Sequence, residues 1–406
     1  MADLSVKRLG LSNPFVIAAS PATHGVQAVL KSARVKPGAI VMRNPRHSRG
    51  GGNLFLPSAQ AVLAGKDAIQ IHAYGKRIGD WFASFEEFFE GVVRARREMP
   101  SEVRLWVSIS AMWETISHPW EEEWVKQAKA AQEAGADAVE LHFNTPGTVA
   151  LRIFDLGRWV YEATKLIKSK VRIPVMVKLP VEGFDPVLLM EAASHAGADG
   201  VGPTGRWRGL VFDLDLKIGP ARPGGGYSGT QILPIMCWIA FEAKQAGIET
   251  PMFAGGGVFS WEGAAKLIMA GSDAVQLGSI ACGLGPTAVE RMTKQLSKWM
   301  DENGYPDLDS MRGKVRDMFD RMAKAPEPQE IYTAAYKATQ VAAAKCINCG
   351  MCEDACWFDS IDRRSGKARK TDACLGCGYC FQVCPTGALA VPSDEIQSRI
   401  KQAEEK

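Results

Sequence analysis

One short phrase occurs three times in the chain and limits its possible folds more than any other feature. It reads AGADAV at 134–139, AGADGV at 196–201 and AGSDAV at 270–275, each time after an amphipathic, helix-like stretch. The glycine is typical of a helix end, because it takes positive φ without steric cost, and the apolar residues that follow are typical of a buried strand. Repeated helix–Gly–strand units predict parallel strands joined by helical crossovers.

Several segments have the apolar pattern of such strands. They are FVIAA (15–19), AIVMR (39–43), LWVSIS (105–110), AVELHF (138–143), PVMVKL (174–179), GVGPT (200–204), PMFAGG (251–256) and AVQLGS (274–279). Helical patterns separate most of them, which predicts a (β/α)8 TIM barrel. A doubly wound open sheet is the alternative. It would carry a Gly-rich fingerprint at its first strand–helix turn, and FVIAASPATHG is not one.

Two long insertions, 44–104 and 205–229, interrupt this pattern. The first contains one possible short strand, AIQIHAY, and a helix around FEEFFEGVVRARR. Both insertions follow the carboxyl end of a strand, which is the face where TIM-barrel enzymes build their active sites.

The composition excludes several classes of protein. Hydrophobic residues make up 46% and charged residues 23%, as in a well-packed globule. The net charge of +3 is too small to indicate binding to nucleic acid. No apolar run is long enough to span a bilayer, and the start, MADLSVKRLG, lacks an apolar signal core. A cytoplasmic protein with no membrane span is therefore expected.

Eight of the ten cysteines lie in two runs, CINCGMCEDAC at 346–356 and CLGCGYCFQVCP at 374–385. Each run has the spacing C-x2-C-x2-C-x3-C, which bacterial ferredoxins use for a pair of 4Fe–4S clusters. In that arrangement the fourth cysteine of each run serves the other cluster. One cluster is then held by Cys346, Cys349, Cys352 and Cys384, and the other by Cys374, Cys377, Cys380 and Cys356. Structural zinc is the alternative, but it prefers paired C-x2-C groups.

One residue in these runs departs from the ferredoxin pattern, because Trp357 stands where proline usually follows the fourth cysteine. Its indole either shields a cluster from water or only packs. Two clusters transfer single electrons, so they require a partner that performs two-electron chemistry, most often a flavin.

Glycine-rich loops follow the last two predicted strands, AGGGVFS at 254–260 and LGSIACG at 277–283. Loops at these barrel positions commonly bind phosphate through backbone N–H groups, although tight turns need glycine too. A third backbone approach is SGT at 228–230.

The chain resembles the dihydroorotate dehydrogenase-like FMN barrels, and among them the flavin and iron–sulfur part of dihydropyrimidine dehydrogenase, including its bacterial PreA-type subunit. The matching segments are NPFVIAASPAT, AGADAVEL, IPVMVKLP, GADGV, GGYSGTQILPI and FAGGGVFS, together with the double-cluster module. The resemblance implies an FMN barrel over 1–302, a helical linker over 303–342, a ferredoxin domain over 343–393 and a charged tail over 394–406.

The resemblance also implies where FMN is bound and how it reacts. The implied FMN contacts are Ala19, Ser20, Arg43, Ser110, His142, Lys178, Thr204, Ser228, Gly229, Gly255, Gly256, Gly257, Gly278 and Ser279. Lys178 stands at the position of a lysine that balances charge on reduced flavin. The alternative for Lys178 is a salt bridge inside the barrel, for which Glu140 is a candidate partner. Hydride passes between FMN N5 and a carbon of a C=C bond in such enzymes.

The fourth strand and its loop, VELHFNTPG at 139–147, depart from the family pattern N-L-S-C-P. Because side chains alternate along a strand, Val139, Leu141 and Phe143 share one face, and Glu140, His142 and Asn144 the other. Thr145 occupies the acid/base position, and His142 replaces an asparagine that binds flavin and substrate. The proton is handled either by Thr145, relayed by a neighbour, or by His142, whose alternative role is a hydrogen bond to flavin.

The predicted substrate pocket is rich in cations rather than amides. The implied substrate contacts are His24, Arg46, His47, Asn144, Arg206 and Trp207, and Arg49, Arg208 and Arg222 lie in the same loops. Any one of these arginines is better explained by a solvated loop, but as a group they favour an anionic unsaturated substrate, such as a carboxylate or a thioester with a phosphorylated carrier.

Three functions remain open on this evidence. The first is a C=C oxidoreductase that acts on an acidic substrate. The second is a true dihydropyrimidine or dihydroorotate dehydrogenase, and the third is an electron-transfer subunit of a larger complex. The chain has no Rossmann fingerprint, so either ferredoxin or a separate NAD(P)H-dependent flavoprotein subunit is expected to supply electrons. By analogy with the mammalian-type enzyme, a homodimer is also expected.

Overall fold

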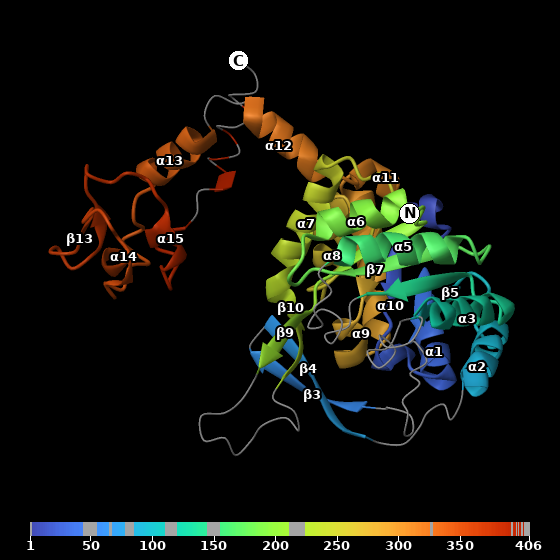
Figure 1. Ribbon diagram of the computed structural model, residues 1–406. Helices are drawn as coiled ribbons and strands as arrows, with labels where there is room; N and C mark the ends of the chain where they lie inside the picture. The colour runs from blue at the N-terminus through green and yellow to red at the C-terminus, as the bar shows by residue number, and fades with distance from the viewer. Residues whose placement is uncertain are drawn as a thin grey trace. The chain divides into compact units, whose positions relative to one another are not determined.

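The computed structural model describes residues 2–43, 55–64, 67–77, 85–109, 120–143, 155–210, 224–324 and 328–390, and residues 393, 394, 396, 398 and 401. The chain forms two compact units, Met1–Val315 and Arg316–Lys406 (Figure 1).

The first unit is a closed barrel of parallel strands, which confirms the predicted TIM barrel. Its strands are β1 (Phe15–Ile17), β2 (Ala39–Met42), β5 (Arg104–Ile109), β6 (Ala138–His142), β7 (Val175–Pro180), β8 (Gly200–Thr204), β11 (Phe253–Gly255) and β12 (Ala274–Leu277). They follow one another around the barrel in the order β1-β12-β11-β8-β7-β6-β5-β2. Each lies inside, or within one residue of, a segment predicted from the sequence.

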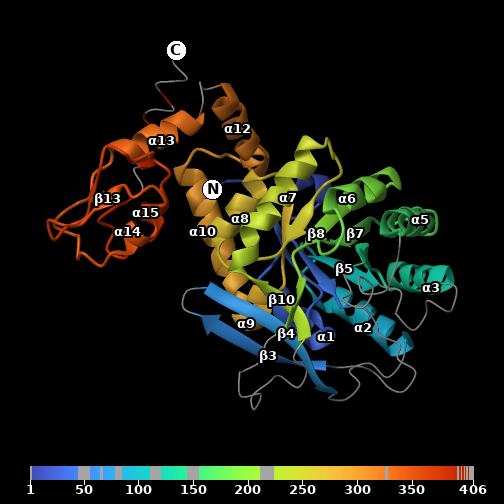
Figure 2. The same ribbon diagram turned by 60° about the vertical axis from the view of Figure 1, so that its left-hand side comes forward.

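Helices surround these strands on the outside of the barrel (Figure 2). They are α1 (Val26–Ala33), α2 (Phe85–Glu98), α3 (Trp120–Glu133), α5 (Leu156–Lys168), α6 (Pro186–His195), α7 (Leu233–Gln245), α8 (Trp261–Met269) and α10 (Thr287–Glu302). Shorter turns are η1 (Lys7–Leu9), η2 (Pro21–Thr23), η4 (Thr230–Ile232), α9 (Ser279–Gly283) and α11 (Leu308–Met311). Side-chain caps fix several helix starts; for example, the Asp185 carboxylate accepts the N–H groups of Val187 and Leu188.

The layer between strands and helices is apolar and tightly packed. Phe143, just past β6, has no exposed surface and lies with its ring centroid 5.1 Å from that of Trp124 on α3 and 4.9 Å from that of Trp159 on α5. Val139 and Leu141 are also fully buried. The odd-numbered residues of β6 therefore face the helices, as the alternation predicted.

The thrice-repeated phrase closes the amino end of the barrel in the same way each time. Its glycines, Gly135, Gly197 and Gly271, all have positive φ, between 84° and 129°. The aspartates that follow two residues later accept backbone N–H groups at the start of the neighbouring strand: Asp137 from Leu105, Asp199 from Val175 and Asp273 from Met252. Each phrase thus ends a helix and fixes the next strand against the one beside it.

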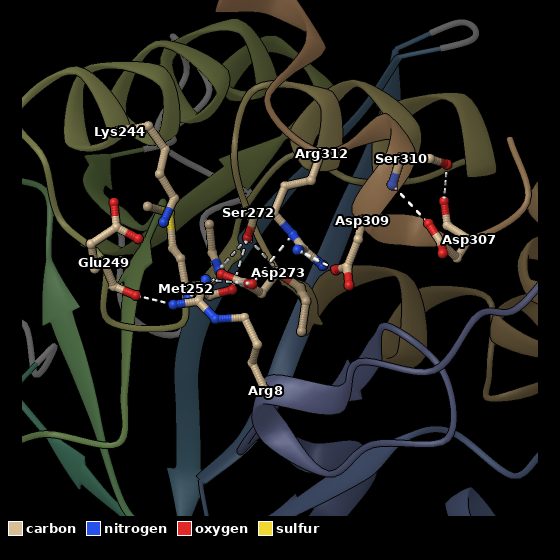
Figure 3. A network of polar contacts seen from close by, with 12 residues as sticks. Arg8, Lys244, Glu249, Met252, Ser272, Asp273, Asp307, Asp309, Ser310 and Arg312 are labelled. Atoms are coloured by element: carbon tan, nitrogen blue, oxygen red, sulfur yellow. Dashed lines mark hydrogen bonds and ion pairs between the residues drawn. The ribbon is translucent and has the colours of Figure 1, made fainter.

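Asp273 has a further role, because it joins the two ends of the first unit (Figure 3). Its carboxylate has no exposed surface and lies 3.1 Å from Arg8 near the amino terminus and 3.2 Å from Arg312 beyond α11. Arg8 also donates to the carbonyl of Glu249. A fully buried carboxylate with two arginines and a backbone donor has the partners that a buried charge requires.

The two insertions form a four-stranded antiparallel sheet of order β3-β4-β10-β9. Its strands are β3 (Phe55–Ala64), β4 (Asp67–Arg77), β9 (Trp207–Leu210) and β10 (Gly224–Gly229). Figures 1 and 2 both show this sheet at the end of the barrel where α9 lies. AIQIHAY was predicted and forms most of β4, but β3, β9 and β10 were not predicted.

The second unit contains α12 (Lys314–Lys324), which begins just before its boundary, α13 (Pro328–Ala338), α14 (Met351–Asp354), β13 (Ile361–Asp362), β14 (Arg369–Lys370) and α15 (Tyr379–Gln382). Its buried residues form two small groups. One contains Cys346, Ile361, Ala368 and Ala388, and the other Cys380, Phe381 and Leu389. Cysteines belong to both groups, so the apolar core and the cysteine sites of this unit overlap.

Candidate functional site

The carboxyl ends of the barrel strands bring together most of the residues that the sequence assigned to a cofactor and substrate site. In the first half of the barrel, Ala19, Ser20 and His24 follow β1, Arg43 follows β2, and His142 ends β6. In the second half, Lys178 lies in β7, Thr204 ends β8 and precedes Arg206 and Trp207, Gly255 ends β11 and precedes Gly256 and Gly257, and Gly278 and Ser279 follow β12. Ser228 and Gly229 end β10 of the insertion sheet. Segments from all over the first unit thus meet at one face of the barrel.

Other predicted site residues lie outside the described part of the chain. These are Arg46, His47, Arg49, Ser110, Asn144, Thr145 and Arg222. The backbone of Arg208 is described as part of β9, whereas its side chain is not. Their assignments stay predictions from the sequence.

Strand register sets the neighbours of Lys178. His142 on β6 and Gly202 on β8 are its partners across the two flanking ladders. Two residues further along β8, Thr204 pairs with Gly255 of β11. Residues in register on adjacent parallel strands point the same way, so His142 and Lys178 face the barrel interior together.

Below this face, several polar side chains contact one another across the interior of the barrel. Glu140 on β6 has no exposed surface, and its Oε2 accepts a 2.6 Å hydrogen bond from Nε2 of Gln276 on β12. Its Oε1 lies 4.0 Å from Nζ of Lys178, whose side chain is 5% exposed. The ion pair considered from the sequence as the alternative for Lys178 is therefore present at the limit of ion-pair distance.

The ammonium group of Lys178 is under opposing influences. Burial lowers its pKa from the ordinary value, Glu140 acts to raise it, and the positive charge of Arg206 lowers it further. A buried lysine without an acid nearby loses its proton readily. The balance between Glu140 and Arg206 thus controls the charge at the mouth of the barrel.

The glycine-rich loops differ in why they need glycine. A Cβ added to Gly256 would lie 2.8 Å from Cα of Gly205, and one added to Gly257 would lie 2.6 Å from the backbone nitrogen of Leu233. These two glycines are required by packing of the chain against itself. At Gly278, by contrast, an added Cβ would meet only Cβ of Ala18, at 3.8 Å. The open space beside Gly278 fits a phosphate group approaching the backbone there.

Side chains on the first strand–helix turn are already engaged in local structure. Ser20 caps η2: its hydroxyl accepts the N–H of Ala22, and its own N–H donates to Oγ1 of Thr23. This capping box holds the turn after β1 rigid. The turn offers a fixed backbone edge at the mouth, and the assignment of Ser20 to FMN stays a prediction.

The cysteines form two quartets in the second unit, each around its own cavity. Cys346, Cys349, Cys352 and Cys384 line one cavity, and Cys356, Cys374, Cys377 and Cys380 line another. Each quartet takes three cysteines from one run and the fourth from the other run. Four thiolates around a cavity are the donor set that a 4Fe–4S cluster requires, so the residues fit that cofactor.

The surroundings of the cysteine sulfurs also suit cluster ligands. Backbone N–H groups of Ala368, Ser360 and Leu389 donate to Sγ of Cys346, Cys356 and Cys384 at 3.2 to 3.5 Å. The hydrogen bond from Ala368 lowers the pKa of Cys346, whereas burial raises the pKa of Cys380 to about 11. Cysteines bind a cluster as thiolates, so cluster binding releases protons.

No three His, Cys, Asp or Glu side chains in the described residues are grouped closely enough to hold a single metal ion. Trp357 is 82% exposed, so its indole makes little contact with the described residues, and its role stays a prediction.

Sequence reasoning missed Gln276 and gave Glu140 only a minor part. A signal for both was present. In AVELH and AVQL the polar residue alternates with buried apolar ones, and in a closed barrel that face must point inward. What the pattern did not contain was the pairing of two strands on opposite sides of the barrel.

Comparison with known proteins agrees with this arrangement. Residues 1–300 match the family model for dihydroorotate dehydrogenase, and residues 345–388 match that for the 4Fe-4S dicluster domain. The chain is 24% identical to the NAD-dependent dihydropyrimidine dehydrogenase subunit PreA of Escherichia coli, with 95% of each chain covered. It is 29% identical to the catalytic subunit of dihydroorotate dehydrogenase B (NAD(+)) from Pyrococcus abyssi, over 44% of this chain and 60% of that protein.

A solved structure shows the same fold. The crystal structure of DHODH from Eimeria tenella in complex with ferulenol has a TM-score of 0.62 at 17% identity, covering 75% of this chain and 86% of that one. Among the described helices, none is both long and apolar enough to cross a membrane. With its barrel, its cysteine quartets and a family match over residues 1–300, the chain belongs to the dihydroorotate dehydrogenase family and is an iron–sulfur flavoprotein oxidoreductase.

Proposed function

We propose that this enzyme reduces, or forms, a C=C bond of a small anionic compound at an FMN in the barrel mouth, and that two 4Fe–4S clusters relay the electrons. The observation that carries the proposal is the pair of cysteine quartets, each drawn from both runs and each lining its own cavity. Such a pair transfers single electrons, so two-electron chemistry calls for a partner, most often a flavin. The barrel mouth, with its buried lysine, is the place for that partner.

The barrel residues would hold FMN from several sides. Gly278 leaves open space for the phosphate, while Lys178 places a positive charge below the mouth. FMN supplies hydride transfer at N5 when bound. Lys178 would balance negative charge there. Arg43, just after β2, stands where a lysine usually contacts the flavin in this family.

A proton has to be delivered on the same face. Thr145 follows β6 and stands at the family's acid/base position, but a hydroxyl with a pKa far above neutrality needs a relay. His142 is half-buried at the end of β6, in register with Lys178. It is the nearest residue on that strand that titrates near neutral pH, and we assign it either the relay of this proton or a hydrogen bond to flavin.

The substrate is proposed to be an acidic unsaturated compound. Arg206 lies close enough to Lys178 to depress the pKa of that lysine, so two basic groups meet at the mouth. Basic side chains that converge on a pocket favour a carboxylate or phosphate. Two asparagines of the family pattern, whose amides would grip a pyrimidine ring, are replaced here by His142 and by Gly205, the residue after Thr204.

The test is to purify the protein without oxygen, measure its cofactors and screen substrates. One FMN and about eight iron per chain are expected, since each cubane contains four. Reduced protein is then mixed with a panel of unsaturated acids, with the corresponding amides and with uracil, and flavin reoxidation is followed in stopped flow. Stoichiometric zinc, or FAD instead of FMN, would contradict the proposal on cofactors.

A second candidate function is that of a dihydropyrimidine dehydrogenase subunit. The observation that favours it is the similarity to PreA over 95% of both chains. Rapid turnover with uracil, and none with unsaturated acids, would establish it. Failure of every compound in the panel to oxidise the flavin would instead favour an electron-transfer subunit of a larger complex.

Electrons are proposed to enter from another protein, either a ferredoxin or a separate NAD(P)H-dependent flavoprotein subunit, and the enzyme is proposed to be a homodimer. With no nicotinamide fingerprint in its sequence, the isolated protein should be reduced slowly by NADH or NADPH and rapidly by a low-potential donor. Fast stoichiometric bleaching of the flavin by NADH alone would reveal a nicotinamide site in this chain.

A further inference from the structure

The fully buried Glu140 lies at the centre of a polar chain that no turn or cap explains. Gln276, Glu140 and Lys178 come from β12, β6 and β7. In the barrel order, β12 and β6 are four positions apart in a ring of eight strands. The hydrogen bond from Gln276 to Glu140 therefore spans the barrel interior.

This placement has an energetic cost that needs a reason. A carboxylate removed from water requires hydrogen bonds or an opposite charge. Within the described part of the chain, Glu140 has one hydrogen bond, through Oε2, whereas Oε1 has no hydrogen-bond partner and faces Lys178 at 4.0 Å. A barrel interior can be filled with apolar side chains at no such cost, so the arrangement indicates a role connected with Lys178.

The surroundings of Lys178 show what that role can be. Glu140 and His142 are its titratable neighbours on β6, Arg206 lies just past β8, and Gln276 of β12 reaches it only through Glu140. Among the described residues, Glu140 is the acid that favours the ammonium form, while burial and Arg206 oppose it. Without Glu140, nothing described around Lys178 would favour its charge.

We propose that Glu140 is a positioning residue that keeps Lys178 in its charged form inside the barrel, and that Gln276 holds Glu140 in place from the opposite wall. The consequence for flavin chemistry rests on the proposed function, since it assumes FMN at the barrel mouth. The link between the two side chains does not, because it is a property of the protein alone.

The first test is the pH dependence of unfolding of the full-length protein as purified, followed by its tryptophan fluorescence, for wild type, Glu140→Gln, Lys178→Met and the double variant. In Glu140→Gln the pKa of Lys178 should fall further, so the unfolded chain binds more protons than the folded one over a wider range below the ordinary lysine value. Stability must then rise with pH through that window, and the unfolding equilibrium constant should fall by up to about tenfold per pH unit.

Lys178→Met and the double variant test the direction of this pH dependence independently. Lys178→Met leaves Glu140 as the uncompensated charge, so the folded protein takes up a proton at a pH where the unfolded chain does not, and stability should fall as pH rises through that window. The double variant lacks both charges and should show neither slope. Replacing both members of a buried pair is often neutral or stabilising, so it is expected to fold.

The second readout is the reduction potential of the bound flavin. At neutral pH, Glu140→Gln should shift the equilibrium toward oxidised flavin about tenfold, which is about 30 mV for a two-electron couple. In the Lys178→Met background the same substitution should change the potential no further. Glu290→Gln is the matched control. It removes an acid that lies 2.6 Å from Lys294 on the exposed surface of α10, and neither readout should respond.

Each outcome has a clear meaning. Wild-type pH slope and wild-type potential in Glu140→Gln would overturn the proposal, and so would an undiminished effect of that substitution in the absence of Lys178. If Glu140→Gln does not fold but the double variant does, the coupling is supported; if the double variant also fails, Glu140 has a purely structural role and the proposal is wrong. Protein without flavin would contradict the proposed function, while the unfolding slopes would still test the pair.

Discussion

The barrel and the cysteine-rich unit are stabilised by different means. The barrel buries a continuous apolar layer in which residues such as Trp106, Phe143 and Phe253 have essentially no exposed surface. The cysteine-rich unit buries only two small groups and leaves Ile347 and Trp357 more than 60% exposed. Small domains with little apolar core commonly depend on metal sites for their stability. The barrel's fold therefore follows from its core, whereas we expect the fold of the second unit to depend on bound iron–sulfur clusters.

The largest effect should come from removing the clusters. Cys384→Ala takes a ligand from the first quartet and removes an apolar contact of both small cores. We expect loss of at least half of the eight irons implied by two cubanes, and unfolding of residues 316–406. Iron content, electron paramagnetic resonance and limited proteolysis would measure this, while the unfolding midpoint of the barrel should stay unchanged. The replacement Cys282→Ala, in the barrel, is the control. If the second unit resists protease without iron, its fold does not depend on clusters.

The next largest effect should come from the barrel core. Phe253 is fully buried in β11, and its ring lies 5.4 Å from Trp106 in an edge-on arrangement. Phe253→Ala should lower the free energy of unfolding of the barrel by about 3–5 kcal/mol, measured by chemical denaturation. The cluster signals should persist until the barrel has unfolded. Leu188, which is 60% exposed on α6, gives the control Leu188→Ala. Equal losses in both units would show that they unfold as one.

A smaller effect is expected at the catalytic face, where a substitution should change the reaction rate and not the stability of the barrel. Thr145→Ala should slow substrate turnover by about tenfold or more while FMN stays bound and reducible, as expected for loss of proton transfer alone. The measurement is flavin reoxidation by substrate in stopped flow, as a function of pH.

His142→Asn distinguishes the two roles proposed for the histidine. If His142 supplies the proton, the substitution should remove the acidic-side pKa of the rate profile; if it only contacts flavin, activity should survive with that pKa intact. Unchanged rates in both the Thr145 and the His142 variants would mean that the proton comes from elsewhere.

The smallest effect is expected at Trp357. Because it is 82% exposed, Trp357→Ala should change the free energy of unfolding of the second unit by no more than about 0.5 kcal/mol. If the indole protects a cluster, iron should nevertheless be lost faster in air. A large loss of stability, with the rate of iron loss unchanged, would mean that the side chain packs in the native protein.

Much of the barrel was predictable, because its strands and helices are specified by local patterns. All eight barrel strands were found from apolar runs and from the glycines that end helices, such as Gly135 and Gly197. The sheet of the two insertions was not, apart from β4. Strand β10, Gly224–Gly229, contains four glycines and has no alternating pattern. It forms because it can pair with β4 and β9, and pairing between segments distant in sequence leaves no periodicity to read.

The sequence by itself determined the spacing of the eight cysteines, the order of the eight barrel strands and, through alternation, the inward face of Glu140 and His142. These features are covalent or local, so they are present in the chain before it folds. Only the tertiary structure decided that Gln276 meets Glu140 across the barrel, that Asp273 joins Arg8 to Arg312, and that the glycines at 256 and 257 serve packing. Those contacts exist because barrel closure brings distant segments within bonding distance, and no local pattern encodes which residues will then face each other.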